Sequence, residues 1–140
     1  MSERDVELMR RWNEALNIRD IDALIALCDP SGVFISTFDE VGGATYHGHE
    51  GIRRYFADLA EAWEEFRVDP EAYFELREHT LAFSVGRGRG SHSGAEVAMP
   101  IAQVARWRDG LMVYIKAYAH REEALRDLGV SLDELEPVEP

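Results

Sequence analysis

The sequence has a single cysteine, no long apolar run and a shortage of basic residues. Because Cys28 has no partner for an internal disulfide, and the first residues show no cationic segment followed by an apolar stretch, we expect a reducing cytoplasm. No run approaches the roughly 18 apolar residues that a membrane-spanning helix needs. The 27 acidic residues outnumber the 15 basic ones, and the net charge of −12 repels phosphate backbones and anionic lipids. We therefore expect no nucleic acid and no membrane among the partners.

Residue patterns of common catalytic and metal sites are also missing. The sequence shows no nucleophile–histidine–acid set, no phosphate-binding loop and no cluster of cysteine and histidine. His47 and His49 form a His-x-His pair, but no third ligand of suitable type is placed nearby, and Gly-His-Glu also starts ordinary helices. We therefore favour a capping role here and expect no metal and no cofactor. Cys28 ends a helical pattern, which favours a small buried hydrophobic residue over a nucleophile.

The residues that are present suit one folded domain. With 140 residues, of which 46% are apolar, the chain can bury a single core but has too little apolar surface for a second one. We therefore expect one domain over residues 1–140, without repeats or linkers.

The spacing of apolar residues predicts helices first and strands later. Apolar residues recur at three- and four-residue spacing in the predicted helices, and β-branched and aromatic residues mark the predicted strands. Asp109-Gly110 between two apolar runs predicts a hairpin. The expected elements are a first helix that is capped by Ser2 and runs to Leu16, helices at 21–27, 48–63 and 120–128, and strands at 33–38, 66–76, 81–85, 97–107 and 111–119. This order predicts an α+β fold in which a curved, mostly antiparallel sheet wraps around the N-terminal and central helices.

Both hairpin strands are apolar on both faces, so both faces need cover. If the helices cover one face, no segment is left over for the other. We therefore expect a homodimer through the outer sheet face. The residues assigned to that face by strand parity are Ile101, Gln103, Ala105, Trp107, Tyr114 and Tyr118.

Three stretches carry a family resemblance: Trp12–Asp20, Tyr46–Phe56, and the Arg-Asp-Gly hairpin followed by Arg121–Leu125. Together they resemble the nuclear transport factor 2 superfamily in its SnoaL-like branch, over nearly the whole chain. The resemblance implies a cone-shaped α+β barrel, or cystatin-like roll, with a deep apolar pocket and usually a dimer. It specifies activity poorly, because the superfamily holds ketosteroid isomerases, polyketide cyclases, dehydratases, epoxide hydrolases and non-catalytic binding modules.

The three catalytic groups of ketosteroid isomerase are not carried over. That enzyme needs a carboxylate base, with a tyrosine and a protonated aspartic acid as oxyanion hole. Ungapped matching places the tyrosine on Trp12, the base on Ser36 and the second acid on Ala102. Because neither serine nor alanine replaces a carboxyl group, we do not expect isomerisation of steroids by that mechanism.

The same matching implies a pocket wall that is mostly apolar and aromatic, which suits a small hydrophobic ligand. Any one aromatic residue can equally be core, so the pocket rests on the whole set. The predicted ligand-binding residues are Trp12, Phe34, Ser36, Phe38, Tyr55, Phe56, Leu59, Trp63, Phe83, Ala102 and Ile115.

Arg87 and Glu96 are the candidate catalytic residues. The matching and the strand period direct both inward, where they would pair across a hairpin and anchor an anionic or strongly polar ligand oxygen. The alternative is that the strand bends outward at Gly86 and Gly88 and leaves Arg87 on a solvated rim.

Two functions stay open at this point. One is a SnoaL-like module that binds a small hydrophobic molecule in the cone pocket, without ketosteroid isomerase chemistry. The other is an enzyme that resembles SnoaL-like polyketide cyclases, dehydratases or epoxide hydrolases, with Arg87 stabilising charge and Glu96 as acid or base.

Overall fold

The computed structural model of the chain describes residues 2–36 and 44–138. Its elements in chain order are α1 (Ser2–Asn17), α2 (Ile21–Ala26), β1 (Cys28–Ile35), β2 (Thr45–His47), α3 (Gly48–Ala62), β3 (Trp63–Glu75), β4 (Thr80–Gly90), β5 (Glu96–Arg108), β6 (Leu111–Tyr118), α4 (Arg121–Leu128) and the 3₁₀ helix η1 (Leu132–Glu134). Within these ranges six strands form one sheet in the order β2-β1-β6-β5-β4-β3, in which only the pair β1–β6 is parallel. The predicted α+β fold with a mostly antiparallel sheet is confirmed.

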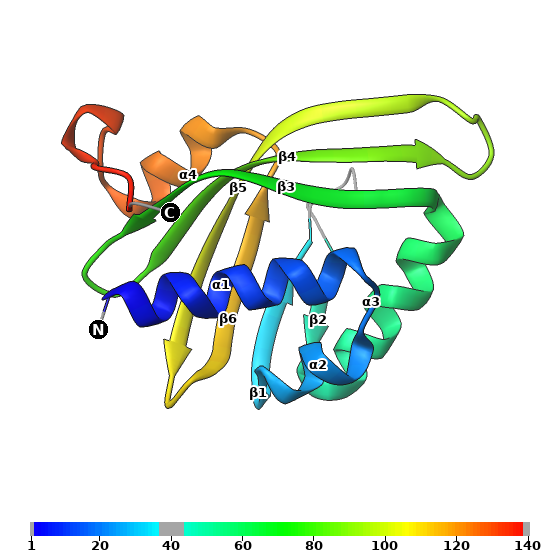
Figure 1. The fold of residues 1–140 in the computed structure, drawn as a ribbon, viewed down its shortest axis with the longest axis horizontal. Coiled ribbons are helices and arrows are strands. Elements are labelled where there is room, and N and C mark those ends of the chain that lie inside the picture. The colour runs from blue at the N-terminus through cyan, green and yellow to red at the C-terminus, as the bar shows by residue number, and fades with distance from the viewer. Residues whose placement is uncertain (1, 37–43, 139–140) are drawn as a thin grey trace.

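Helices cover both faces of the sheet. Figure 1 shows α1 lying across the strands, with α3 at one end and α4 beyond the sheet. We call the face that packs on α1 and α3 the inner face, and the face that packs on α4 the outer face. Each face has its own apolar cluster, a large one under α1 and α3 and a smaller one under α4. The sheet therefore has two buried faces within one chain.

The predicted hairpin is confirmed. Asp109 and Gly110 join β5 to β6 with φ angles of 55° and 79°, which are the positive values that a two-residue turn of this kind needs. Other boundaries shift. The first strand was expected at 33–38, but β1 begins at Cys28 because that residue already pairs with Met112 of β6.

The faces of β5 are the reverse of the prediction. Ile101, Gln103 and Ala105, expected on the outer face, are buried in the large inner cluster or bonded to α1. Ala102 and Val104 lie on the outer face under α4. The expectation that no segment could cover the second face is also wrong, because α4 covers it with Leu125 and Leu128 packed there. Of the residues first assigned to the outer face, Tyr118 does lie there, in the cluster under α4. The homodimer through the outer sheet face stays a prediction.

A buried amide pair explains why β5 takes this orientation. Asn13 of α1 donates from Nδ2 to Oε1 of Gln103 over 3.1 Å, and Gln103 donates from Nε2 to Oδ1 of Asn13 over 2.9 Å. The hydroxyl group of Ser84 also donates to Oε1 of Gln103, at 3.4 Å. A buried amide without partners costs free energy, and turning Gln103 to the outer face would break both bonds to α1. The amide pair therefore fixes which face of β5 meets α1.

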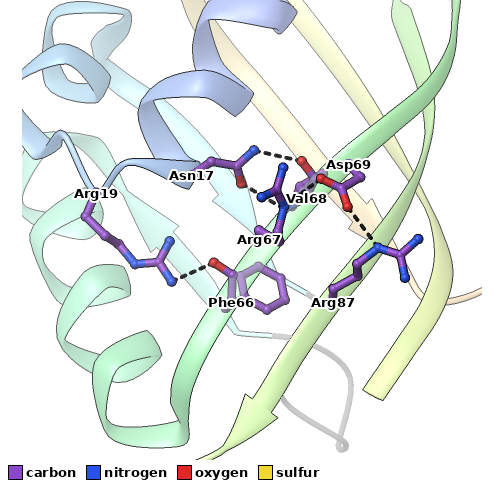
Figure 2. A network of polar contacts seen from close by, with 7 residues as sticks. All are labelled: Asn17, Arg19, Phe66, Arg67, Val68, Asp69 and Arg87. Carbon is purple, nitrogen blue, oxygen red and sulfur yellow. Dashed lines mark hydrogen bonds and ion pairs between the residues drawn. The ribbon is translucent and has the colours of Figure 1, made fainter. Parts of the chain in front are cut away.

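The free edge of β3 is protected along much of its length. Figure 2 shows the side chain of Asn17 bonding both backbone groups of Val68, at 2.8 Å each, and Arg19 donating to the carbonyl oxygen of Phe66. Farther along, the N–H group of Val138 donates to the carbonyl oxygen of Tyr73. Unpaired edge strands invite association with other chains, and these contacts block that route while they dock the end of α1 on the sheet.

Cys28 is buried, as expected for a small hydrophobic residue. Burial, reinforced by the nearby Asp29 carboxylate, raises the pKa of the thiol to about 11. The thiol is therefore neutral near pH 7 and a poor nucleophile.

We predict that Gln103→Leu destabilises the chain by about 1–3 kcal/mol, because it leaves the buried amide of Asn13 without its partner. The double variant Asn13→Leu with Gln103→Leu should cost less than the sum of the two single changes. Urea unfolding of the four proteins in this cycle measures the coupling. Strictly additive costs would show that the amide pair does not orient β5.

Glu75 at the end of β3 gives the second prediction. Desolvation, with a smaller effect of the Asp5 carboxylate, raises its pKa from 4.5 to about 7. The folded state therefore binds this proton more tightly than the unfolded state. The contribution of protonated Glu75 to the free energy of unfolding is complete below pH of about 4.5 and is lost as pH rises through about 7. The partly solvated carboxyl group limits the loss to about 1 kcal/mol.

The measurement is the free energy of unfolding from pH 4.5 to pH 8. Glu75→Gln should flatten its pH dependence, and the exposed Glu61→Gln serves as the matched control. Equal pH profiles for wild type and Glu75→Gln would rule out this coupling.

Candidate functional site

Aromatic side chains fill the inner face near β1, β2 and α3. The ring of Phe34 lies 4.6 Å from that of Tyr55, 5.9 Å from that of Tyr46 and 6.1 Å from that of Trp12, measured between centroids. The rings of Tyr55 and Phe56 are 5.7 Å apart. We call these five residues the ring cluster. Most of its pairs meet edge to face, the arrangement that aromatic rings prefer.

Close backbone contact places Tyr46 against α3. A Cβ atom on Gly51 would lie 2.9 Å from the carbonyl carbon of Tyr46, so only glycine lets β2 approach the helix this closely. Tyr55, Asp58 and Ala62 follow Gly51 at helical spacing and continue the same face of α3. This face and Tyr46 form two sides of a cavity.

The cavity is small, at about 20 Å³, and it reaches the surface at Asp58 and Ala62, which are exposed. Its lining residues are Tyr46, Tyr55, Asp58, Leu59, Ala62 and Trp63. The hydroxyl group of Tyr46 donates to Oδ2 of Asp58 over 2.7 Å. Burial raises the pKa of Tyr55 well above its ordinary value, so its phenol stays protonated. The cavity therefore combines aromatic walls with a carboxylate at one end.

Trp63 closes the cavity on the side of β4. A Cβ atom on Gly88 would lie only 2.7 Å from Cε3 of Trp63, so the indole packs directly on the backbone of β4. The Trp63 ring also lies 5.8 Å from that of Phe66. The glycines of β4 thus make room for aromatic rings, and the strand runs unbroken past them.

A larger hollow lies on the other side of this wall. It has a volume of about 550 Å³, and we call it the arm groove. Its lining residues are Asn17, Glu65, Phe66, Arg67, Arg87, Gly88, Arg89, Glu96, Val97 and Ala98. Phe66 lines the groove and contacts Trp63, so these two rings separate the groove from the cavity.

Arg87 lies in the arm groove on the outer parity of β4, and the predicted inward pair with Glu96 is wrong. Figure 2 shows Arg87 donating from Nε to Oδ2 of Asp69, at 2.8 Å, while Arg67 donates to Oδ1 at 2.6 Å. The Arg87 side chain is 53% exposed. Burial alone would raise the pKa of Asp69, but the two arginines outweigh it and hold that pKa below its usual value. Glu96 is exposed and pairs with Arg89 at 3.3 Å.

Most of the predicted ligand-binding residues reach the inner face. Those found there are Trp12, Phe34, Ser36, Tyr55, Phe56, Leu59, Trp63 and Ile115. Phe38 lies outside the described residues. All of these inner residues except Trp63 are buried in the core, so the chain without ligand uses them for packing.

Phe83 and Ala102 are corrections, because both lie on the outer face under α4. The ring of Phe83 packs 5.1 Å from that of Phe74, and the Arg121 guanidinium stacks over it at 4.8 Å. Register explains the pair, since Phe83 lies opposite Ala102 in the β4–β5 ladder. The inward residue beside Ala102 is Gln103, which also lacks an acid group.

Sequence reasoning missed Asp58 and Tyr46 as site residues, and named Tyr46 only at the start of a stretch that carries the family resemblance. The signal was the spacing of Gly51, Tyr55, Asp58 and Ala62, which puts a carboxylate on the same helix face as a buried tyrosine. The contact to Tyr46 was not readable, because it depends on the close packing of β2 on α3.

His49 does not join a metal site in the part of the chain that the structure describes. Its Nε2 atom lies 2.8 Å from the carbonyl oxygen of Cys28, and no group of three or more potential metal ligands occurs among the described residues. The described helices also include none with the length and apolar character required to cross a bilayer.

Comparisons with known proteins identify the fold and the family. The SnoaL-like domain model matches residues 9–115. Similar solved structures include a nuclear transport factor 2-like protein of unknown function from Burkholderia pseudomallei, at 20% identity and a TM-score of 0.75, covering 88% of this chain and 95% of that one. A protein with ketosteroid isomerase-like fold from Catenulispora acidiphila, in complex with trimethylamine, has 22% identity, a TM-score of 0.73 and coverages of 91% and 95%.

A putative SnoaL-like polyketide cyclase from Shewanella denitrificans has 15% identity and a TM-score of 0.69, covering 88% of this chain and 95% of that one. At these identities the structures show the fold alone. Comparison with curated proteins finds no match. Since the family model covers well over half of the sequence, the chain belongs to the SnoaL-like domain family and has its nuclear transport factor 2-like fold.

Proposed function

We propose that the chain binds a small, mainly apolar molecule on the inner face of the cone, without ketosteroid isomerase chemistry. The small cavity between Tyr46, Tyr55 and Trp63, next to the ring cluster, carries this proposal. Binding sites for small molecules are concave, mostly apolar and supplied with few polar groups. The cavity has this composition, with Asp58 and the tyrosine hydroxyl groups as its polar groups.

The ligand enters by displacing Trp63. A cavity of about 20 Å³ holds one water-sized group, so a larger body needs more room. Trp63 is half-buried, and beyond it lies the arm groove. Moving the indole off Gly88 joins the two volumes without unfolding a strand. The Catenulispora protein of similar fold was solved in complex with trimethylamine, a small organic molecule, which supports the proposal.

The inner face argues against isomerase chemistry. Ser36 is buried where the catalytic base would be matched, and the inward position on β5 is Gln103, whose amide is already bonded to Asn13. A serine hydroxyl group is a far weaker base than the carboxylate that this mechanism uses, and the Gln103 amide is not basic near pH 7.

Turnover of a standard ketosteroid isomerase substrate such as 5-androstene-3,17-dione should be indistinguishable from the uncatalysed rate. Absorbance of the conjugated product measures it directly. Enzyme-dependent turnover that disappears in Ser36→Ala would overturn this part of the proposal.

Toluene should bind to the purified chain with a measurable heat, and Ala62→Leu should weaken that binding at least about tenfold. Ala62 lines the cavity from an exposed position at the end of α3, so leucine there adds bulk at the cavity mouth. Isothermal titration calorimetry gives both affinities.

The matched control is Ala60→Leu, an exposed position on the same helix that does not line the cavity. It should bind toluene like the wild type. No binding of toluene by the wild type, or an equal loss in both variants, contradicts a ligand site at this cavity.

A further inference from the structure

The polar end of the cavity accepts hydrogen bonds. The Tyr46 hydroxyl group donates a hydrogen bond to Oδ2 of Asp58, and a hydroxyl oxygen that donates can also accept. An ionised carboxylate has acceptor sites only, and its two oxygens offer about four of them. A group placed beside the hydrogen bond between Tyr46 and Asp58 therefore meets acceptors and a negative charge.

The walls add attraction for a positive charge. Tyr46, Tyr55 and Trp63 line the cavity together, and the negative faces of aromatic rings attract cations, with tryptophan the strongest. The rings of Tyr46 and Tyr55 lie 5.4 Å apart at 77°, so they present different surfaces to the same space. Aromatic walls and one carboxylate are the two elements with which proteins hold organic ammonium groups.

Positive charges near this wall are held elsewhere. Arg19 acts on Tyr55 through space, but its guanidinium group donates to the carbonyl oxygens of Leu16 and Phe66 at 2.7 and 2.8 Å. The arginines of the arm groove pair with Asp69 and Glu96 across the Trp63–Phe66 wall.

We infer that the cavity selects an organic ammonium compound, with its cationic head beside the hydrogen-bonded pair of Asp58 and Tyr46 and its apolar body against the ring cluster. This inference rests on the proposed function and names its ligand class. An ammonium head is about the size of a water molecule, which matches the 20 Å³ of the cavity. The net charge of −12 steers cations towards the chain and repels anions. The ligand chemistry is thus opposite to that expected from an inward Arg87.

Three probes of similar shape test the inference: benzylamine, benzyl alcohol and benzoate. At pH 7 they carry a positive charge, no charge and a negative charge. Calorimetry should show benzylamine binding about tenfold more tightly than benzyl alcohol, with benzoate weakest. Benzyl alcohol also has a donor, so equal affinities for it and benzylamine would overturn selection of a cation.

Two variants locate the effect. Asp58→Asn keeps the size of the side chain and an acceptor for Tyr46 but removes the charge. It should therefore lower the affinity for benzylamine about tenfold and leave the affinity for benzyl alcohol unchanged. Tyr46→Phe removes the hydroxyl acceptor but leaves the Asp58 carboxylate available to the ligand. The affinity for benzylamine should therefore fall less than in Asp58→Asn. Glu61→Gln is the matched control, because it removes the same charge from the same helix away from the cavity. An equal loss in Asp58→Asn and Glu61→Gln would reduce the effect to long-range charge and overturn the site.

The outcomes also separate the inference from the proposed function. One outcome is that toluene and benzyl alcohol bind, that Ala62→Leu weakens their binding, and that benzylamine binds no more tightly than benzyl alcohol. In that case the ligand site stands and the ammonium inference fails. If none of the probes binds, both fail. Thermal unfolding of each variant confirms that it is folded before binding is compared.

Discussion

The pair of hydrogen bonds between Asn13 and Gln103 is the contact on which the arrangement of the sheet depends. Strand β5 is apolar on both faces, so hydrophobic burial alone does not decide which face meets α1. A buried amide does decide it, because only one orientation gives Gln103 a partner. Because β4 pairs with β5, the orientation of β5 also determines which face each residue of β4 lies on. Gly86 and Gly88 therefore face inward and Arg87 faces outward.

The inward glycines then shape the site. Because Gly88 has no side chain, Trp63 lies flat against the sheet and closes a small cavity beside the ring cluster. The same parity puts Arg67 and Arg87 on the far side of that wall, where they neutralise Asp69. One orientation of the sheet thus produces an aromatic interior with one carboxylate, and an arginine-lined groove outside it.

The order of elements, the Asp-Gly hairpin and the apolar stripe of α3 were predictable, because each follows from spacing within a short stretch. The side that each residue of β4 and β5 faces was not, since both sides of β5 are apolar and a shift of one residue exchanges them. That single uncertainty moved Phe83, Ala102 and Arg87 to the wrong face. The contact of Tyr46 with Asp58 depends on how closely β2 approaches α3, which periodicity does not encode.

The central claim is that the cavity beside the ring cluster, and not the arm groove, receives the ligand. A crystal structure of the chain soaked with bromobenzene tests it most directly, because anomalous scattering locates the bromine without ambiguity. The account predicts the bromine among Tyr46, Tyr55 and Leu59, with the indole of Trp63 moved away from Gly88. Bromine in the arm groove beside Arg67 and Arg87, with Trp63 still packed on Gly88, would contradict it.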